Sequence, residues 1–244
     1  MRKITEFIAV WTFVLLFSFI FQGQILSQLS YQSVDPDIYD KSDNEYVSLI
    51  AYKLPFRGEN YKFYGTLSYH IYGRAFVGCK VHNTVIEAYH LSEQTCIETS
   101  FKILKSSRRK NGRIIKNHSK KNGHHIIFMT PMLKKKKPIK HYYRTGIFRV
   151  FKRFDKSGNS KQNKKVEIDF ENMAKHIINL DVSAKMYGLR IKKIIFNRFF
   201  LDELYSCPSG QKLKERDIYF AKFLSEKVNR KYDDLFYVEF VDIK

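Results

Sequence analysis

The sequence is poor in acidic residues. Its 244 residues include 24 Asp and Glu against 44 Lys and Arg, which gives a formal net charge of +20. An excess of this size favours an anionic partner, such as nucleic acid, acidic lipid headgroups or an anionic cell-wall polymer. Proteins from AT-rich genomes are also often rich in lysine, so the charge alone does not choose a partner. Hydrophobic residues make up 44% of the chain, which is enough for a packed core and argues against disorder.

Several motifs of catalysis and cofactor binding are missing. The three cysteines, Cys79, Cys96 and Cys207, have no CxxC spacing, which excludes a cysteine-based zinc site. The sequence has no glycine-rich phosphate loop and no nucleophile-elbow motif, which excludes the common nucleotide-binding and serine-hydrolase patterns. Outside the cytoplasm the cysteines allow one disulfide and one spare thiol, and the sequence does not choose the pair.

Long hydrophobic runs are also missing. The apolar run from Phe7 to Phe21 has fifteen residues, whereas a membrane-spanning helix needs about 20. Two basic residues precede the run, which is typical of a secretory signal peptide. No cysteine lies directly after the run, which excludes a lipoprotein anchor. A tolerable cleavage site ends at Ser27, so we predict that residues 1–27 are a signal peptide. We expect a protein of the periplasm or cell envelope, with an uncleaved signal anchor in the inner membrane as the alternative.

The patterning of the rest of the chain predicts an α+β fold. Apolar residues at helical spacing predict helices at Lys80–Ser92, Phe170–Ala184 (with Asp169 as N-cap and Gly188 after the end) and Arg216–Asn229. Short apolar runs predict strands at Ile126–Met129, Ile191–Phe196 and Leu235–Ile243, and basic polar stretches predict loops at Lys105–Lys121 and Lys152–Lys165. The lack of βαβ regularity indicates an antiparallel sheet flanked by helices. Residues 28–65 are predicted to be an extended N-terminal arm and residues 66–244 the folded domain.

Stretches in a recognisable order carry a resemblance to a known family. They are LPFRGENYKFY (Leu54–Tyr64) with GRAFVGCKVHNTVIEAY (Gly73–Tyr89), NGRIIKNHSKKNGHHIIFMTP (Asn111–Pro131), VEIDFENMAKHIINLDVSAKMYGLRIKKIIFN (Val166–Asn197) and KYDDLFYVEF (Lys231–Phe240). Together they resemble the penicillin-insensitive murein endopeptidases, zinc peptidases of the LAS type that cut peptidoglycan cross-links. The second stretch is similar to the family segment His-x-x-Gly-x-x-x-Asp, and the last to its His-Asp-x-His-x-His-Val closing strand. The resemblance implies a LAS-type fold over nearly all of the mature chain.

The same resemblance implies where zinc would be held, and those positions are changed in this chain. The ligand His and Asp of the family segment His-x-x-Gly-x-x-x-Asp fall on Lys120 and Ile127. The family's ligand His in the closing strand falls on Tyr237. Two nearby family histidines fall on Tyr232 and Leu235. A lysine ammonium repels a divalent cation, isoleucine has no ligand atom, and a phenol with a pKa of about 10 is a poor zinc ligand at neutral pH. We therefore expect no intact metal site, no cofactor and no catalysis.

Other histidines offer at most a displaced metal site. His118 and His125 lie in the stretch Asn111–Pro131, and the period of two places His125 on the same strand face as Ile127. These two histidines would supply two ligands, whereas a catalytic zinc takes about three from the protein. A metal held in this way belongs to the alternative that the chain is an active or altered murein hydrolase.

Basic side chains form a candidate binding rim around the expected cleft. The members of this basic rim are Arg108, Arg109, Arg113, Lys116, Lys120 and Lys121. Such charges suit the carboxylates of a murein peptide or another anionic envelope polymer, although a solvated loop has the same composition. The leading hypothesis is an exported, catalytically inactive protein that binds peptidoglycan or acts as a scaffold in the envelope, with other envelope proteins as partners and no nucleic acid. A structural subunit of an envelope complex is a further alternative.

Overall fold

The computed structural model describes residues 50–110, 113–114, 123–139 and 152–243. The chain divides into two compact units, Met1–Val47 and Ser48–Lys244, and the described residues all belong to the second. The predicted signal peptide and the first part of the predicted arm therefore lie outside the described residues. Among the helices that the structure describes, none is long and apolar enough to cross a membrane.

A five-stranded sheet lies at the centre of the second unit, with the strand order β11-β12-β7-β4-β2. Its strands are β2 (Tyr61–Phe63), β4 (Phe101–Lys105), β7 (His125–Met129), β11 (Leu189–Ile195) and β12 (Leu235–Asp242). The α+β class is confirmed, but the prediction of an antiparallel sheet is wrong, because β2 runs parallel to β4 while the other neighbours are antiparallel. The chain passes from β2 to β4 through a helix, and such a crossover places two strands side by side in the same direction.

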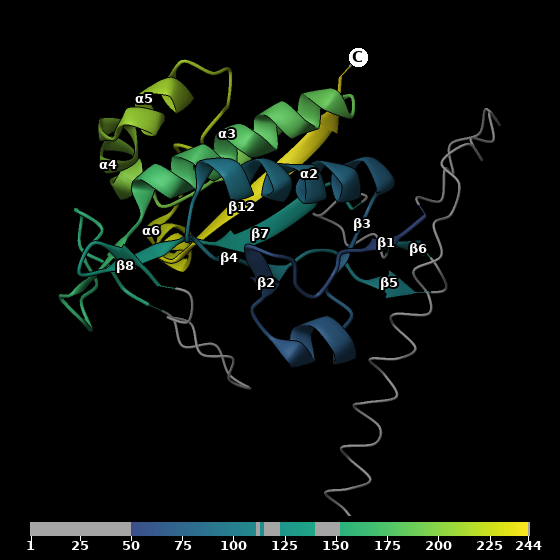
Figure 1. Cartoon of the computed structure of the whole chain (residues 1–244), viewed down its shortest axis with the longest axis horizontal. Coiled ribbons are helices and arrows are strands. Elements are labelled where there is room, and N and C mark those ends of the chain that lie inside the picture. Colours follow the sequence, from purple (N-terminus) through teal and green to yellow (C-terminus); the bar gives the residue numbers. More distant parts are fainter. Residues whose placement is uncertain (1–49, 111–112, 115–122, 140–151, 244) are drawn as a thin grey trace, which may run out of the picture. The chain divides into compact units, whose positions relative to one another are not determined.

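Two long helices, α2 (Cys79–Thr95) and α3 (Phe170–Met186), pack against each other and cover one face of this sheet (Figure 1). Their apolar stripes, which predicted both helices, are buried: Val81, Val85 and Ala88 in α2, and Met173, Ile177, Leu180 and Ala184 in α3. Burial of these stripes against the sheet stabilises the fold through the hydrophobic effect.

Local signals set both ends of α3. The carboxylate of Asp169 accepts a hydrogen bond from the backbone N–H of Asn172 at 3.0 Å, which caps the first turn as predicted. Beyond the last turn, Gly188 has a φ of 68°, a left-handed conformation that glycine adopts at low cost. The chain can therefore reverse directly into β11.

Smaller elements complete the described part of the chain. Three small sheets pair β1 (Tyr52–Lys53) with β3 (Phe76–Val77), β5 (Arg109–Lys110) with β6 (Arg113–Ile114), and β8 (Met132–Lys134) with both β9 (Lys137–Pro138) and β10 (Val166–Ile168). The short helices are η1 (Leu67–Ile71), η2 (Arg198–Phe200), α4 (Leu201–Ser206), α5 (Pro208–Lys214), α6 (Glu226–Asn229) and η3 (Arg230–Tyr232). The small β5–β6 pairing falls within the predicted loop, and β2 falls within the predicted arm, where it forms an edge of the central sheet.

The predicted helix Arg216–Asn229 is wrong, since only its last four residues are helical, in α6. The residues before α6 run along β11 instead: the N–H of Ile194 donates to the carbonyl of Tyr219, and the N–H of Ala221 donates to the carbonyl of Ile194, both at 2.9 Å. Phe223, which the helical pattern expected to be buried, is 95% exposed. The edge of β11 needs hydrogen-bond partners, and satisfying it outweighs the helical spacing of this segment.

Candidate functional site

The central sheet has two faces, and the ring of His176 in α3 identifies the one that the helices cover. This ring stacks on Phe101 of β4 with centroids 4.4 Å apart, and it meets Phe128 of β7 edge-on at 5.2 Å. Side chains alternate along a strand, so Lys102 and Ile127, the neighbours of these phenylalanines, project from the opposite side. We call this opposite side, turned away from α2 and α3, the far face.

The far face brings together two of the positions that the resemblance assigns to zinc ligands. Tyr237 of β12 is the cross-strand partner of Ile127 in β7, and Leu235 is the partner of Met129. Cross-strand partners in an antiparallel pair have Cβ atoms about 5 Å apart. Ile127, Leu235 and Tyr237 are all buried, at 6%, 5% and 7% exposure. Two segments far apart in the sequence thus meet at this point, and the side chains that meet are aliphatic and aromatic.

His125 lies on the same face, beside Tyr237. The two rings stack with centroids 5.7 Å apart and an interplanar angle of 22°, and the cross-strand partner of His125 is Glu239. The hydroxyl of Tyr237 donates to Oε2 of Glu239 at 3.4 Å. Burial, and then the Glu239 carboxylate, raise the pKa of Tyr237. The phenol therefore stays protonated at neutral pH and offers no phenolate to a metal ion.

The carboxylate of Glu239 is already neutralised by two lysines of β11. Lys192 lies 2.7 Å and Lys193 lies 3.2 Å from its two oxygens. Burial alone would raise the pKa of Glu239, but the hydrogen bonds from these lysines outweigh it and lower the pKa. Within the described part of the chain, no group of three or more His, Cys, Asp or Glu side chains is placed to hold a metal ion. With no donor atom on Ile127 and a protonated Tyr237, the side chains at this point do not fit zinc.

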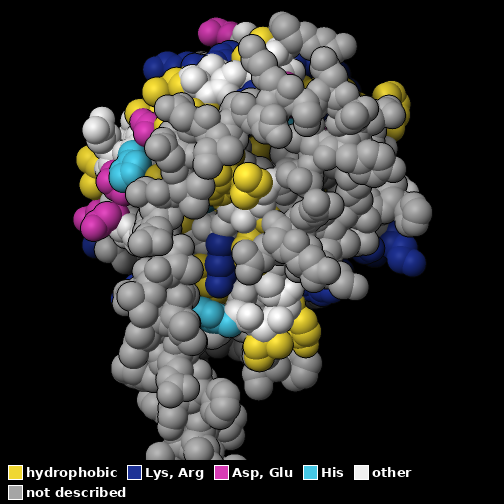
Figure 2. All heavy atoms as spheres, turned by 90° about the vertical axis from the view of Figure 1, so that its right-hand side faces the viewer, with side chains coloured by type: hydrophobic (Ala, Val, Ile, Leu, Met, Phe, Trp, Pro, Cys, Tyr) yellow, Lys and Arg dark blue, Asp and Glu magenta, His cyan; other side chains and the backbone are white. Residues whose placement is uncertain are grey.

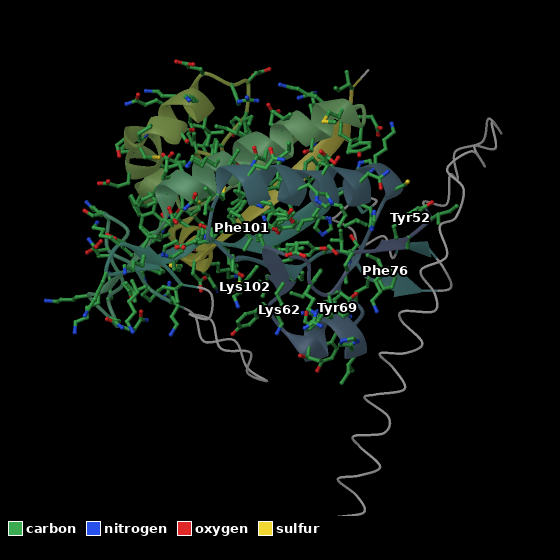
Figure 3. The ribbon with its side chains drawn as sticks, viewed as in Figure 1. Tyr52, Lys62, Tyr69, Phe76, Phe101 and Lys102 are labelled. Carbon is green, nitrogen blue, oxygen red and sulfur yellow. The ribbon has the colours of Figure 1, made fainter. Side chains whose placement is uncertain are left out.

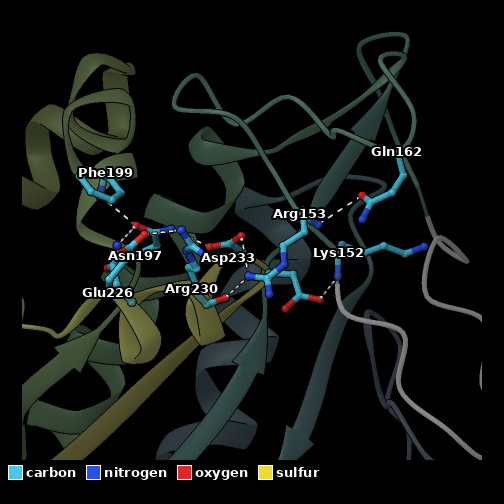
Figure 4. A network of polar contacts seen from close by, with 10 residues as sticks. Lys152, Arg153, Gln162, Asn197, Phe199, Glu226, Arg230 and Asp233 are labelled. Atoms are coloured by element: carbon cyan, nitrogen blue, oxygen red, sulfur yellow. Dashed lines mark hydrogen bonds and ion pairs between the residues drawn. The ribbon is translucent and has the colours of Figure 1, made fainter.

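A polar network holds the chain just before β12 (Figure 4). Asp233 accepts a hydrogen bond from the side-chain amide of Asn197 at 2.7 Å, and the guanidinium of Arg153 lies 3.4 Å from its other oxygen. Asn197 in turn accepts from the side chain of Asn229 at 2.7 Å. Burial raises the pKa of Asp233 even though Asn197 and Arg153 act to lower it. These contacts fix the point at which β12 enters the sheet, and so the position of Tyr237.

The basic rim is only partly described. Four residues predicted for the site lie outside the described residues: Lys116, His118, Lys120 and Lys121. For Arg109 and Arg113 the structure describes the backbone, in the paired strands β5 and β6. Arg108 is exposed, and its guanidinium lies 6.0 Å from the ring centroid of Tyr72, with Arg74 at 5.3 Å from the same ring. Figure 2 shows basic and histidine side chains beside hydrophobic ones on one face of the molecule.

The other residues singled out in the sequence, Tyr232 and the three cysteines, form no part of a metal site among the residues that the structure describes. Tyr232, at the end of η3, packs against the core, and burial raises its pKa. All three cysteines are described and are free thiols, so no disulfide joins them in this structure. Burial also raises the pKa of Cys207 to about 11, which keeps this thiol protonated and unreactive at neutral pH.

Two lysines that no motif singles out also lie on the far face (Figure 3). Lys62 of β2 is the cross-strand partner of Lys102 in β4, and Lys102 is in turn the partner of Met129 in β7. Lys102 is buried, at 7% exposure. The alternation of apolar and basic residues in Tyr61–Phe63 and Phe101–Ile103 is the sequence signal that indicates one lysine-bearing face on each strand.

No family model and no curated protein matches this chain. The resemblance to murein endopeptidases therefore rests on the quoted motifs and on the positions that they assign.

Proposed function

We propose that this chain is an exported, catalytically inactive relative of the LAS-type murein endopeptidases and that it binds peptidoglycan in the cell envelope. The observation that carries the proposal is the pairing of Ile127 with Tyr237 on the far face. The resemblance assigns these positions, from two separate motifs, to ligands of a single metal ion, and ligands of one ion must converge. Their convergence supports the alignment on which the proposed ancestry rests.

The chemistry of the same two residues supports the loss of catalysis. Zinc peptidases use the metal to lower the pKa of a bound water and to polarise the scissile carbonyl. Ile127 has no atom to offer such a metal, and burial keeps the phenol of Tyr237 protonated. The third position, Lys120, carries an ammonium group and lies outside the described residues. A chain without these ligands retains a surface for binding but not the means of hydrolysis.

Binding is favoured by the positive charge of the chain. The net charge of +20 attracts polymers that carry carboxylates, as murein peptides do. Tyr237 and His125 stack on each other but are buried, at 7% and 6% exposure, so contact with the polymer falls to exposed basic side chains such as Arg108. The signal-like segment at residues 1–27 supports an envelope location, where this ligand is found.

The proposal is tested by measuring zinc and peptidoglycan binding on one preparation of the protein. We expect no stoichiometric zinc after purification without chelator, no release of muropeptides from isolated sacculi, and sedimentation of the protein with sacculi at low salt. Restoring all three ligands, with Lys120→His, Ile127→Asp and Tyr237→His, should recover zinc binding if the resemblance is right. The matched control changes three residues to the same types away from the far face: Lys222→His, Ile218→Asp and Tyr219→His.

Other outcomes separate the alternatives. One equivalent of zinc in the parent, lost on changing His118 or His125, would contradict an inactive protein in favour of a displaced metal site. Failure to sediment with sacculi, together with co-purification of an envelope protein, would contradict peptidoglycan binding in favour of a structural subunit. Zinc uptake by the control triple variant as strong as by the restored one would remove the support for the ligand assignment.

A further inference from the structure

Lys62 and Lys102 place two ammonium-bearing side chains next to each other at one end of the far face. They are register partners in adjacent parallel strands, and neighbouring strands lie about 4.8 Å apart. The residues beside them, Tyr61, Phe63 and Phe101, are buried in the hydrophobic core on the opposite side of the sheet. The pleat therefore directs both lysines to the same side (Figure 3).

Neither lysine has an acidic counterpart among the described residues. The described part of the chain contains no carboxylate in ion-pair contact with either of them, and the charge that acts on Lys102 is that of Lys62. Lys102 is 7% exposed and Lys62 is partly buried. Burial, and then repulsion from Lys62, lower the pKa of Lys102. Burying an ammonium group without a counter-charge is unfavourable, so this arrangement calls for a negative charge from outside the chain.

The groups around the pair add aromatic rings and further positive charge. The Nζ atom of Lys62 lies 5.5 Å from the ring centroid of Phe56, and that of Lys53 lies 4.4 Å from the centroid of Tyr69. The Phe56 and Tyr69 rings are in turn 5.0 Å apart. Two lysines, both only partly exposed, thus lie over one pair of rings. Charges in such surroundings act more strongly on a ligand than charges in open solvent.

We propose that Lys62 and Lys102 form a binding site for a phosphate group. A phosphate monoester carries a charge of about −1.5 to −2 at pH 7 and three acceptor oxygens, so one group matches both ammonium charges, whereas a carboxylate matches only one. Lysine binds phosphate as a compact point charge with three rotatable donors. The phosphate belongs to a soluble compound or to a lipid headgroup. This site does not depend on the proposed binding of peptidoglycan.

The test is a titration with inorganic phosphate, followed by NMR on the amides of β2 and β4 at an ionic strength held constant with chloride. We expect saturable shifts in the parent and an affinity about tenfold or more lower in Lys102→Met and in Lys62→Met, since each loses one charge-assisted contact. Methionine keeps the volume of the stem. Lys222→Met, which removes an exposed lysine, is the matched control and should bind as the parent does. Without phosphate, Lys102→Met should have a higher Tm than the parent, because it removes an unpaired buried charge.

The remaining measurements decide whether the ligand is phosphate and whether the phosphate belongs to a lipid headgroup or to a soluble compound. No saturable response in the parent, or a response in Lys102→Met and Lys62→Met as strong as that of the parent, would overturn the site. Acetate binding as tightly as phosphate would overturn the assignment to phosphate. Vesicles of phosphatidylcholine with phosphatidic acid, bound by the parent and not by Lys102→Met, would support the site with a lipid headgroup as its source. A response to phosphate without vesicle binding would support it with a soluble compound. Neither result depends on whether the protein sediments with sacculi.

Discussion

At the scale of single residues, His176 shows how strongly the core acts on a titratable group. The side chain is 1% exposed, and its ring stacks on Tyr89 with centroids 5.0 Å apart and on Phe101 at 4.4 Å. Its Nδ1 atom lies 3.5 Å from the hydroxyl of Ser92. Burial lowers the pKa of His176 to about 3. The folded protein therefore keeps this imidazole neutral at pH values where a histidine in the unfolded chain takes up a proton.

This difference predicts a fall in stability with falling pH. Between about pH 6.5 and about pH 3 the unfolded chain binds one proton more than the folded protein at His176, so the free energy of unfolding decreases as pH decreases. The slope from this group is at most about 1.4 kcal/mol per pH unit. His176→Phe keeps an aromatic ring that can stack but does not titrate. It should reduce the slope of the free energy of unfolding against pH by about this amount. Urea denaturation at pH 7, 6, 5 and 4 measures it.

The control for this experiment is His90→Gln, which removes an exposed histidine beside Glu93. It should leave the pH profile of the parent nearly unchanged. Parallel profiles for the parent and for His176→Phe would mean that His176 is protonated in the folded protein, against the pKa that its burial implies.

At the scale of secondary-structure elements, Asn197 is a junction between the end of β11, the helix α6 and the start of β12. Its side-chain oxygen accepts from Asn229 at 2.7 Å and from the N–H of Phe199 at 3.0 Å, and its amide donates to Asp233 at 2.7 Å. Asn229 and Asp233 are themselves buried, at 1% and 7% exposure. Removing the amide of Asn197 therefore leaves polar groups buried without these partners.

We predict that Asn197→Leu lowers the free energy of unfolding by about 2–4 kcal/mol, because each buried polar group left without its partner costs about 1–3 kcal/mol. Leucine has the same branched arrangement of side-chain heavy atoms, so no cavity opens and the loss comes from hydrogen bonds. Urea denaturation monitored by circular dichroism gives the value. Gln211→Leu, an exposed amide in α5, is the matched control and should stay within about 0.5 kcal/mol of the parent. Equal stabilities of both variants would show that the junction does not hold these elements together.

At the scale of the whole molecule, the positive charge should govern binding to an anionic polymer. The chain carries a net charge of +20, and the described member of the basic rim, Arg108, is exposed beside Tyr72 and close enough to Arg74 to repel it. Exposed charges are screened by salt, with a Debye length of about 10 Å at 0.1 M and about 3 Å at 1 M. Binding through the rim should therefore weaken strongly with ionic strength.

We predict that the triple variant Arg108→Glu, Arg109→Glu and Arg113→Glu sediments poorly with sacculi at low salt, and that the parent loses binding as salt rises to 1 M. Pelleting of the protein with sacculi across a salt series measures both effects. The matched control, Lys212→Glu, Lys222→Glu and Lys227→Glu, makes the same change in net charge at exposed lysines outside the rim. If the control loses binding as much as the rim variant does, the net charge and not the rim determines the interaction.

The sequence by itself determined the elements whose signals are local. The buried stripes of α2 and α3, the cap at Asp169 and the apolar run of β7 depend on residues a few positions apart, and the structure confirms each of them. The lack of a zinc donor at Ile127 is likewise a property of one side chain. Period-two alternation also placed His125 and Ile127 on one face of their strand before any strand partner was known.

Only the tertiary structure decided what depends on segments far apart in the chain. The pairing of Ile127 with Tyr237 and the parallel pairing that joins Lys62 to Lys102 come from strand register, which no local pattern specifies. The segment before α6 has helical spacing, but the unpaired edge of β11 offers it hydrogen bonds that a pattern of apolar residues cannot reveal. Local periodicity reports which face of an element is apolar, whereas the partner of that face is chosen by the free energy of the whole packed molecule.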